Sequence, residues 1–155
     1  MKPLQKASVC GLGKRGACIA ATLAPRGLDV IDIDIDAEKV RNINAGQPQV
    51  DVPLLAETIT AGRTRLRATQ DYRQAAATDV TFSIPPSPSP PDESFSNEFL
   101  LRAMQRVAAA VRETGKKGHL FVCRSTTTPG AVDTALIRPL EWETGGVCGR
   151  DFGVC

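Results

Sequence analysis

The stretch Gly11-Leu12-Gly13-Lys14-Arg15-Gly16 decides the fold of this chain. It is a G-x-G-x-x-G sequence that follows a short apolar run at 7–10 and opens a helical pattern at 13–24. In this context Gly11 permits a tight turn, Gly13 leaves room for a pyrophosphate to approach the backbone, and Gly16 lets the helix pack against the strand. The helix N-terminus adds free N–H groups and a positive dipole end. The motif therefore predicts a Rossmann-type site for a dinucleotide.

Two cations, Lys14 and Arg15, occupy the first turn of this expected helix. Cations there oppose the helix dipole by ~0.3–1 kcal/mol, and a bound pyrophosphate would reverse that penalty. They are candidate phosphate contacts, and the alternative is that both are ordinary solvated side chains.

The rest of the chain alternates short apolar runs with helical patterns, which predicts a parallel sheet with helices on both faces. We expect an α/β fold: one Rossmann-type domain over residues 1–155, with a doubly wound, mostly parallel sheet of about six strands. The expected strands are 7–10, 28–34, 65–69, 79–84, 119–123 and 152–155, and the expected helices are 13–24, 36–45, 53–61, 71–77, 96–111 and 131–140. Phe99 lies on the apolar face of the helix at 96–111. The proline-rich segment at 85–91 is expected to be a rigid loop inside the domain.

An acidic residue about 20 positions beyond the glycines is expected to hydrogen-bond the adenosine ribose. Asp34, at the end of the second strand, fits best, while Asp32 and Asp36 are alternatives within two residues. Asp36 is better suited to capping the next helix. A carboxylate at this place repels a 2′-phosphate, so the predicted cofactor is NAD rather than NADP.

Two hydroxyl residues follow strands that border the expected crevice. In the doubly wound order the fourth strand lies beside the first, so the loop after Ile84, which contains Ser87, faces the cofactor. Thr126 follows the fifth strand in the same way. Ser87 and Thr126 are therefore candidate contacts, although such residues are also common turn formers.

Composition excludes several classes of partner. Nineteen basic and seventeen acidic residues give a net charge of +2, without the basic excess of a nucleic-acid binder. No apolar stretch approaches the ~18 residues of a membrane span. We expect a soluble cytoplasmic protein with no nucleic-acid or membrane partner.

The five cysteines have no Cys-x-x-Cys spacing, and His119 is the single histidine. Zinc and a disulfide framework are therefore not expected, and the sequence predicts no metal site. Cys10 and Cys123 lie in apolar runs, where a thiol usually behaves as a small buried hydrophobe. None of the cysteines is a convincing nucleophile.

Several segments in order carry a family resemblance: the glycine stretch, Val-Ile-Asp-Ile-Asp-Ile-Asp with Glu-Lys-Val in 30–40, Ile-Asn-Ala-Gly at 43–46, Pro-Ser-Pro at 86–88, Phe-Ser-Asn at 95–97, Arg-Ser-Thr-Thr-Thr-Pro-Gly at 124–130, and Cys-Gly-Arg-Asp-Phe-Gly-Val-Cys at 148–155. Together they resemble the N-terminal domain of the UDP-glucose/GDP-mannose dehydrogenase family, of the UDP-ManNAc or UDP-glucose type. The resemblance implies a role in polysaccharide biosynthesis. It also implies NAD contacts from Arg15, Asp34, Lys39, Ser87 and Thr126.

Two positions depart from the family pattern. Pro85-Pro86 stands where the family usually has Val-Pro, which shortens the hydrogen bonding of the fourth strand. Asp32 stands where the family often has glycine, and it is expected to add negative charge beside the adenosine pocket.

The resemblance also implies what the chain lacks, namely the family's central helix and its C-terminal sugar-binding domain with the catalytic cysteine. We therefore expect no catalytic residue in this chain and no turnover by it alone. A nucleotide sugar would bind only with the missing domain, and a homodimer would form only in the full-length enzyme. The alternatives are a related domain of a 6-phosphogluconate or hydroxyacyl-CoA type dehydrogenase, or a non-catalytic NAD-sensing module.

Overall fold

The computed structural model describes residues 3–84, 98–124 and 129–155. Its six strands form one sheet in the order β3-β2-β1-β4-β5-β6, and every neighbouring pair is parallel. The fourth strand lies beside the first, which confirms the doubly wound topology expected from the sequence. The strands are β1 (Lys6–Cys10), β2 (Asp29–Ile33), β3 (Leu66–Thr69), β4 (Val80–Ser83), β5 (His119–Cys123) and β6 (Phe152–Val154).

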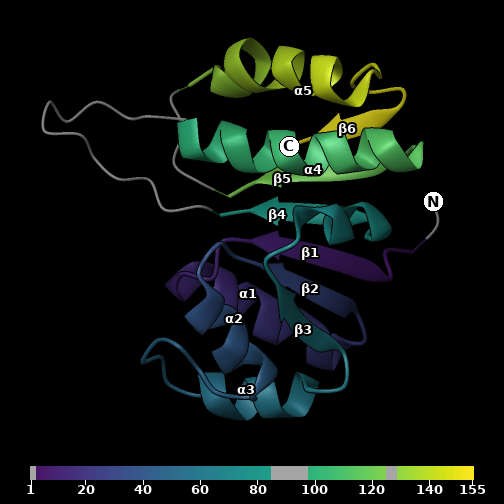
Figure 1. The fold of residues 1–155 in the computed structure, drawn as a ribbon. Coiled ribbons are helices and arrows are strands. Elements are labelled where there is room, and N and C mark those ends of the chain that lie inside the picture. Colours follow the sequence, from purple (N-terminus) through teal and green to yellow (C-terminus); the bar gives the residue numbers. More distant parts are fainter. Residues whose placement is uncertain (1–2, 85–97, 125–128) are drawn as a thin grey trace, which may run out of the picture.

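Helices cover both faces of this sheet, so the molecule has three layers (Figure 1). One face packs against α1 (Lys14–Leu23), α2 (Ala37–Asn44) and α3 (Leu55–Gly62), and its core contains Val9, Val30 and Ile59. The other face packs against η2 (Tyr72–Ala77), α4 (Glu98–Thr114) and α5 (Ile137–Thr144), and its core contains Met104 and Phe121. Burial on both faces explains why apolar residues of the strands point to both sides of the sheet, as Val30 and Ile31 do in β2.

Local signals in the sequence account for most helix ends. The carboxylate of Asp36 accepts hydrogen bonds from the backbone N–H groups of Glu38 and Lys39, so it caps α2 as predicted. Gly46 follows that helix with a φ of 77°, the left-handed stop that glycine favours. The first helix ends in a short 3-10 turn, η1 (Ala24–Arg26), followed by Gly27 with a φ of 95°.

Two predicted helices differ in type from an ordinary α-helix. The segment after Asp71 is the 3-10 helix η2, which is only six residues long and is capped by Asp71 through the N–H of Arg73. The predicted helix at 131–140 is divided into a π-helical turn, η3 (Val132–Leu136), and α5. Pro139 has no N–H to donate to the carbonyl four residues earlier, so a regular α-helical ladder cannot run through this region.

The prediction that Phe99 lies on the apolar face of its helix is wrong. Phe99 is 46% exposed, whereas Leu100 and Met104 on the same helix are buried. Phe99 instead lines the pocket beside Asp34 at the start of α4. Ser96, the predicted cap of this helix, lies outside the described residues.

The single histidine, His119 at the start of β5, belongs to a group of buried side chains that are joined by hydrogen bonds. The Nδ1–H of His119 donates to the carbonyl of Thr78 at 3.0 Å, so Nε2 accepts the hydroxyl hydrogen of Thr81 at 2.9 Å. Thr81 in turn lies 2.6 Å from the hydroxyl of Ser8. Burial and the nearby Lys116 lower the pKa of His119 to about 4, so the ring is neutral at neutral pH. These contacts make His119 a structural residue of the core.

Asp32 is the least expected feature of the sheet. Its side chain alternates with Ile31 and Ile33 along β2 and therefore faces the α1 side, where it is fully buried. Within the described part of the chain neither carboxylate oxygen has a hydrogen-bond partner. Burial, with a further contribution from Asp34, raises the pKa of Asp32 well above its usual value. The expectation of a negative charge beside the adenosine pocket is thus wrong, because this carboxyl group is inside the core and favours its neutral form.

None of the helices within residues 3–84, 98–124 and 129–155 combines the length and apolar composition needed to cross a membrane.

We predict that Asp32→Asn stabilises the protein increasingly as pH rises from 4 to 6. In the unfolded chain an aspartate ionises near pH 4, whereas the folded protein holds Asp32 neutral to higher pH. Stability is therefore lost between those two pKa values, by up to about 1.4 kcal/mol per pH unit, and asparagine removes that loss. Urea unfolding of both proteins at pH 4, 5 and 6 measures the difference. If the free energies of unfolding of the two proteins changed in parallel between pH 4 and 6, the assignment of a neutral carboxyl group to Asp32 would be contradicted.

We also predict that Leu54→Gly raises the free energy of unfolding by about 1 kcal/mol. Leu54 precedes α3 with a φ of 65°, the only positive value of a non-glycine residue in the described ranges, and its side chain is 71% exposed. Glycine adopts this conformation without strain, and little buried surface is lost. Leu54→Ala is the control, since it keeps the strain and shortens the side chain. Equal thermal stability of the glycine and alanine variants would refute the prediction.

Candidate dinucleotide-binding site

The glycine stretch forms a tight loop between the carboxyl end of β1 and the start of α1. Gly11 has a φ of 107°, a conformation that other residues rarely adopt. A β-carbon on Gly16 would lie 1.9 Å from the carbonyl oxygen of Gly11, so only glycine permits this close approach of helix and strand. A β-carbon on Gly13 would meet no atom of residues 3–84, 98–124 and 129–155 within 4 Å. The space beside Gly13 is therefore open to a ligand.

The first turn of α1 suits an anion. Gly13 caps the helix without a side-chain hydrogen bond, and no acidic residue lies in the first turn. The backbone N–H groups of this turn thus point toward the open space with the positive end of the helix dipole. Lys14 and Arg15 are both exposed there. Their charges would be stabilised by a phosphate bound at this helix end.

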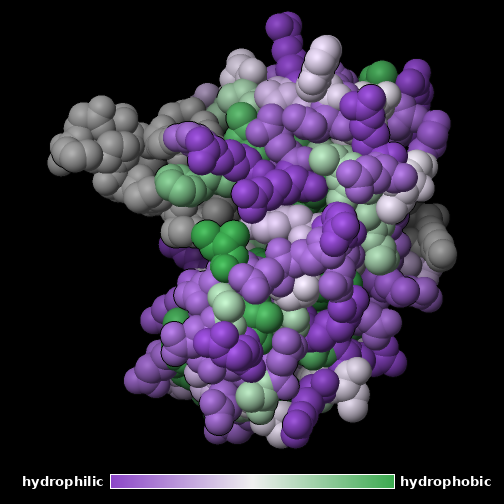
Figure 2. All heavy atoms as spheres, viewed as in Figure 1, coloured by the Kyte–Doolittle hydropathy of each residue, from purple (hydrophilic) through white to green (hydrophobic). Residues whose placement is uncertain are grey.

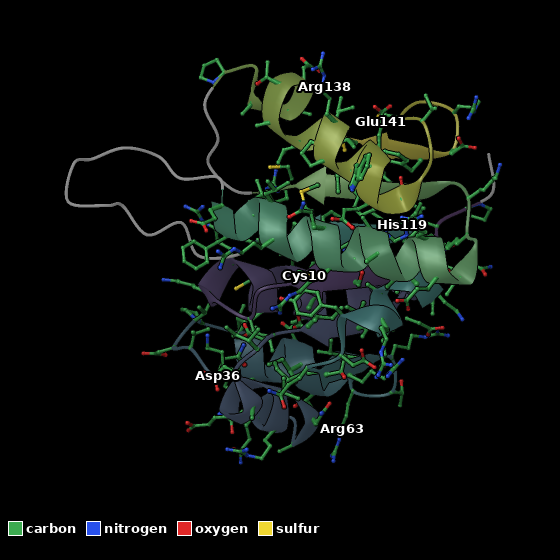
Figure 3. The ribbon with its side chains drawn as sticks, turned by 45° about the horizontal axis from the view of Figure 1, so that its top comes forward. Cys10, Asp36, Arg63, His119, Arg138 and Glu141 are labelled. Atoms are coloured by element: carbon green, nitrogen blue, oxygen red, sulfur yellow. The ribbon has the colours of Figure 1, made fainter. Side chains whose placement is uncertain are left out.

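Asp34 lies directly beside the loop. One carboxylate oxygen, Oδ2, accepts the N–H of Leu12 at 2.5 Å, and the other, Oδ1, accepts the N–H of Asp36 at 2.9 Å. The ammonium group of Lys39 lies 3.9 Å from Oδ2, and only 8% of Asp34 is exposed. Of the three acidic candidates, Asp34 is the one at the glycine loop, because Asp32 faces the core and Asp36 caps α2. Figure 3 shows Asp36 near the end of the molecule that carries α2, well away from His119.

A pocket of about 250 Å³ opens next to Asp34. Arg106 lies over the ring of Tyr72, 5.1 Å from its centre, and this pair forms one wall. Hydrophobic residues are visible between α4 and α2 on an otherwise largely hydrophilic face (Figure 2). The lining residues come from β1, η2 and α4 and from the loops after β1 and β2: Cys10, Gly11, Asp34, Ile35, Tyr72, Phe99, Arg102, Ala103 and Arg106.

The pocket and the loop form one continuous site, because Gly11 belongs to both and Asp34, which lines the pocket, accepts a hydrogen bond from Leu12 of the loop. Its flat aromatic and aliphatic walls suit an adenine ring, its carboxylate suits ribose hydroxyls, and its helix end suits a pyrophosphate. The described residues therefore fit the adenosine half of a dinucleotide. Ser87 and Thr126, the predicted contacts for the other half, lie outside the described residues.

Sequence reasoning missed the wall formed by Tyr72, Phe99 and Arg106. Tyr72 and Phe99 stand about 60 and 90 positions after the glycine loop, and no local motif marks them as site residues. Burial raises the pKa of Tyr72, so its hydroxyl remains protonated at neutral pH.

Cys10 is the thiol nearest to this site, and Figure 3 shows it in the layer beneath α4. It is buried, and burial together with Asp32 and Asp34 raises its pKa far above the usual range. A thiol that stays protonated is not a nucleophile. Cys123 is only half-buried, so it is less enclosed than the sequence suggested. In the described ranges no three His, Cys, Asp or Glu side chains gather where they could hold a metal ion.

Comparison with known proteins bears on the identity of this site. Residues 5–155 match the family model described as the UDP-glucose/GDP-mannose dehydrogenase family, NAD binding domain. A GDP-mannose 6-dehydrogenase from Pseudomonas aeruginosa is 33% identical over 150 residues, which cover 95% of this chain and 34% of that protein. The UDP-glucose 6-dehydrogenase AglM from Haloferax volcanii is 41% identical over 127 residues, 79% of this chain and 28% of that protein. The chain thus spans about a third of the length of these relatives.

The fold agrees with these matches. The crystal structure of a ternary complex of GDP-mannose dehydrogenase from Pseudomonas aeruginosa superposes with a TM-score of 0.91 at 33% identity, covering 96% of this chain and 34% of that one. The matching part carries the cofactor in this family, as the description of the family model states. The chain therefore belongs to the UDP-glucose/GDP-mannose dehydrogenase family, in which it corresponds to the NAD-binding domain.

Proposed function

We propose that this chain is the cofactor-binding part of a nucleotide-sugar 6-dehydrogenase, which oxidises the C6 alcohol of the sugar to a carboxylate with NAD. The observation that carries the proposal is the glycine loop, whose open face at Gly13 lies beside Asp34. The match to GDP-mannose and UDP-glucose 6-dehydrogenases supports the substrate class. We further propose that the enzyme is cytoplasmic and supplies sugar acids for polysaccharide synthesis.

Each candidate residue has a distinct part in holding the cofactor. The backbone around Gly11, Gly13 and Gly16 and the charges of Lys14 and Arg15 would hold the pyrophosphate. The carboxylate of Asp34 would accept the hydroxyls of the adenosine ribose, with Lys39 beside it at 3.9 Å. Ser87 and Thr126 are proposed to contact the nicotinamide end.

The bound cofactor supplies a hydride acceptor, and this chain's residues hold it in place. The proposal assigns the sugar-binding groups and the thiol that captures the aldehyde to residues outside this chain. The buried, protonated Cys10 supports that assignment, since it does not provide a thiolate. A homodimer and a bound nucleotide sugar are likewise proposed only for the longer enzyme.

We predict that the protein binds NAD at least tenfold more tightly than NADP, a difference of ~1.4 kcal/mol. Asp34 lies at the ribose position and would repel a 2′-phosphate. Asp34→Gly should weaken the binding of both NAD and NADP, because Leu12 loses its hydrogen bond. It should also reduce the ratio of the two affinities. Calorimetric titration gives both affinities. Asp36→Asn is the control. Asparagine also caps helices, so the ratio of the NAD affinity to the NADP affinity should not change. Equal affinities in the unaltered protein would exclude this role of Asp34.

We predict that Gly13→Val lowers NAD affinity by more than about tenfold and leaves the fold largely intact. The valine side chain would occupy the open space beside the loop, where no atom of the described residues lies within 4 Å of the β-carbon. Gly16→Ala is the contrasting variant, because its β-carbon collides with the Gly11 carbonyl and should destabilise the fold. Unchanged NAD affinity in a folded Gly13→Val protein would show that the loop is only a structural turn.

We predict that the 155-residue chain reduces no NAD when supplied with UDP-sugars or GDP-sugars, although it binds NAD. Positioning the sugar against the cofactor can account for ~7–11 kcal/mol of a reaction barrier, and the proposal places those groups elsewhere. Absorbance of the reduced cofactor, followed with a panel of nucleotide sugars, is the measurement. Turnover that disappears when one of the five cysteines is replaced would identify that cysteine as the nucleophile and refute the proposal.

A further inference from the structure

Gln49 reaches the glycine loop from a distant part of the chain. It lies in the segment between α2 and α3, and its side-chain Nε2 donates a hydrogen bond to the carbonyl oxygen of Leu12 at 3.1 Å. On the other side of the same residue, the N–H of Leu12 donates to Asp34. Both peptide groups that flank Leu12 are therefore held by side chains, one 22 and the other 37 residues away along the chain.

The bond from Gln49 has a consequence for the next amide. The Leu12 carbonyl and the Gly13 N–H belong to one planar trans peptide group, so they point in opposite directions. A donor that holds the carbonyl toward the protein therefore turns the Gly13 N–H away from Gln49. Gly13 is exposed, and the space beside it is open. Its N–H is one of the donors that a pyrophosphate at this loop would use.

The surroundings of Gln49 indicate that the contact is built into the fold. Val50 and Val52, which follow Gln49 directly in the chain, pack against the core cluster on the α1 side and anchor the segment next to its approach to the loop. The other amide atom of Gln49, Oε1, is buried and has no hydrogen-bond partner in the described part of the chain. An unsatisfied buried acceptor costs stability, so packing alone does not explain an amide at this place.

We propose that Gln49 is a positioning residue of the cofactor site, which orients the Gly13 amide for the pyrophosphate by holding the Leu12 carbonyl. The inference rests on the proposed NAD-binding function. It assigns a role in cofactor binding to the segment between α2 and α3. This segment contributes no residue to the lining of the pocket beside Asp34.

The test compares Gln49→Met and Gln49→Glu with the unaltered protein. Methionine keeps the length of the side chain and removes both the donor and the unsatisfied Oε1. The gain from removing Oε1 offsets the loss of the donor to the Leu12 carbonyl, so the variant should keep a thermal stability close to that of the unaltered protein. NAD and ADP-ribose should bind about fivefold more weakly to it, the effect of one neutral hydrogen bond. Adenosine, which lacks the pyrophosphate, should bind with unchanged affinity. Gln49→Glu is nearly isosteric and also lacks the donor, but its carboxylate faces the Leu12 carbonyl oxygen and adds negative charge near the loop. Its loss of affinity for NAD and ADP-ribose should therefore be larger than that of Gln49→Met, with adenosine again unaffected.

A spectroscopic measurement on the ligand-free protein separates orientation from stability. The ¹⁵N chemical shift of the Gly13 amide responds to the hydrogen bond at the Leu12 carbonyl, so it should move in both Gln49 variants. Gln47→Ala is the matched control, because Gln47 is exposed in the same segment, and both the shift and the NAD affinity should stay the same.

Folded Gln49 variants that bind NAD as tightly as the unaltered protein would overturn the positioning role and leave the proposed function intact. A loss that is equal for adenosine and ADP-ribose would also overturn it, since that pattern reflects general damage to the site. An unaltered protein that binds no NAD would refute the proposed function and this inference with it.

Discussion

A β-carbon at Gly16 would lie 1.9 Å from the carbonyl oxygen of Gly11, so α1 approaches the end of β1 more closely than any other residue would allow. This contact places the first turn of α1 at the carboxyl edge of the sheet. The positive φ of Gly11 makes the turn that leads there. The backbone N–H groups of the loop, the open space at Gly13 and the position of Asp34 all depend on this packing, because a wider separation would move the helix end away from the strands.

Asp34 and Asp32 are separated by one residue, but their surroundings differ and give the two carboxyl groups different roles. Asp34 lies beyond the end of β2, where two backbone N–H groups stabilise its charge. Asp32 lies within β2 under α1, where neither oxygen has a partner in the described ranges and burial raises its pKa. The first can serve a ligand, and the second lowers stability at neutral pH. The same sheet therefore supplies a binding group at its edge and excludes charge from its interior.

Local sequence signals predicted most of the elements. The fifth strand, the capping of α2 by Asp36 and the left-handed stop at Gly46 were found from a few neighbouring residues, because each depends only on local backbone chemistry. The 3-10 form of η2 and the π-turn before Pro139 were not predicted. Periodicity gives the presence of a helix, whereas its hydrogen-bond pattern depends on how short segments fit between neighbours.

The sequence by itself determined the alternation of strands and helices and the glycine loop, and it favoured Asp34 over its neighbours, since periodicity and the spacing within the first βαβ unit are local properties. Only the tertiary structure decided that Tyr72 and Arg106 form a wall beside Asp34, that Asp32 is fully buried under α1, and that Gln49 holds Leu12. These contacts join residues that are far apart in the chain. They exist because helices pack on both faces of the sheet, and that packing is fixed by the whole core rather than by any local motif.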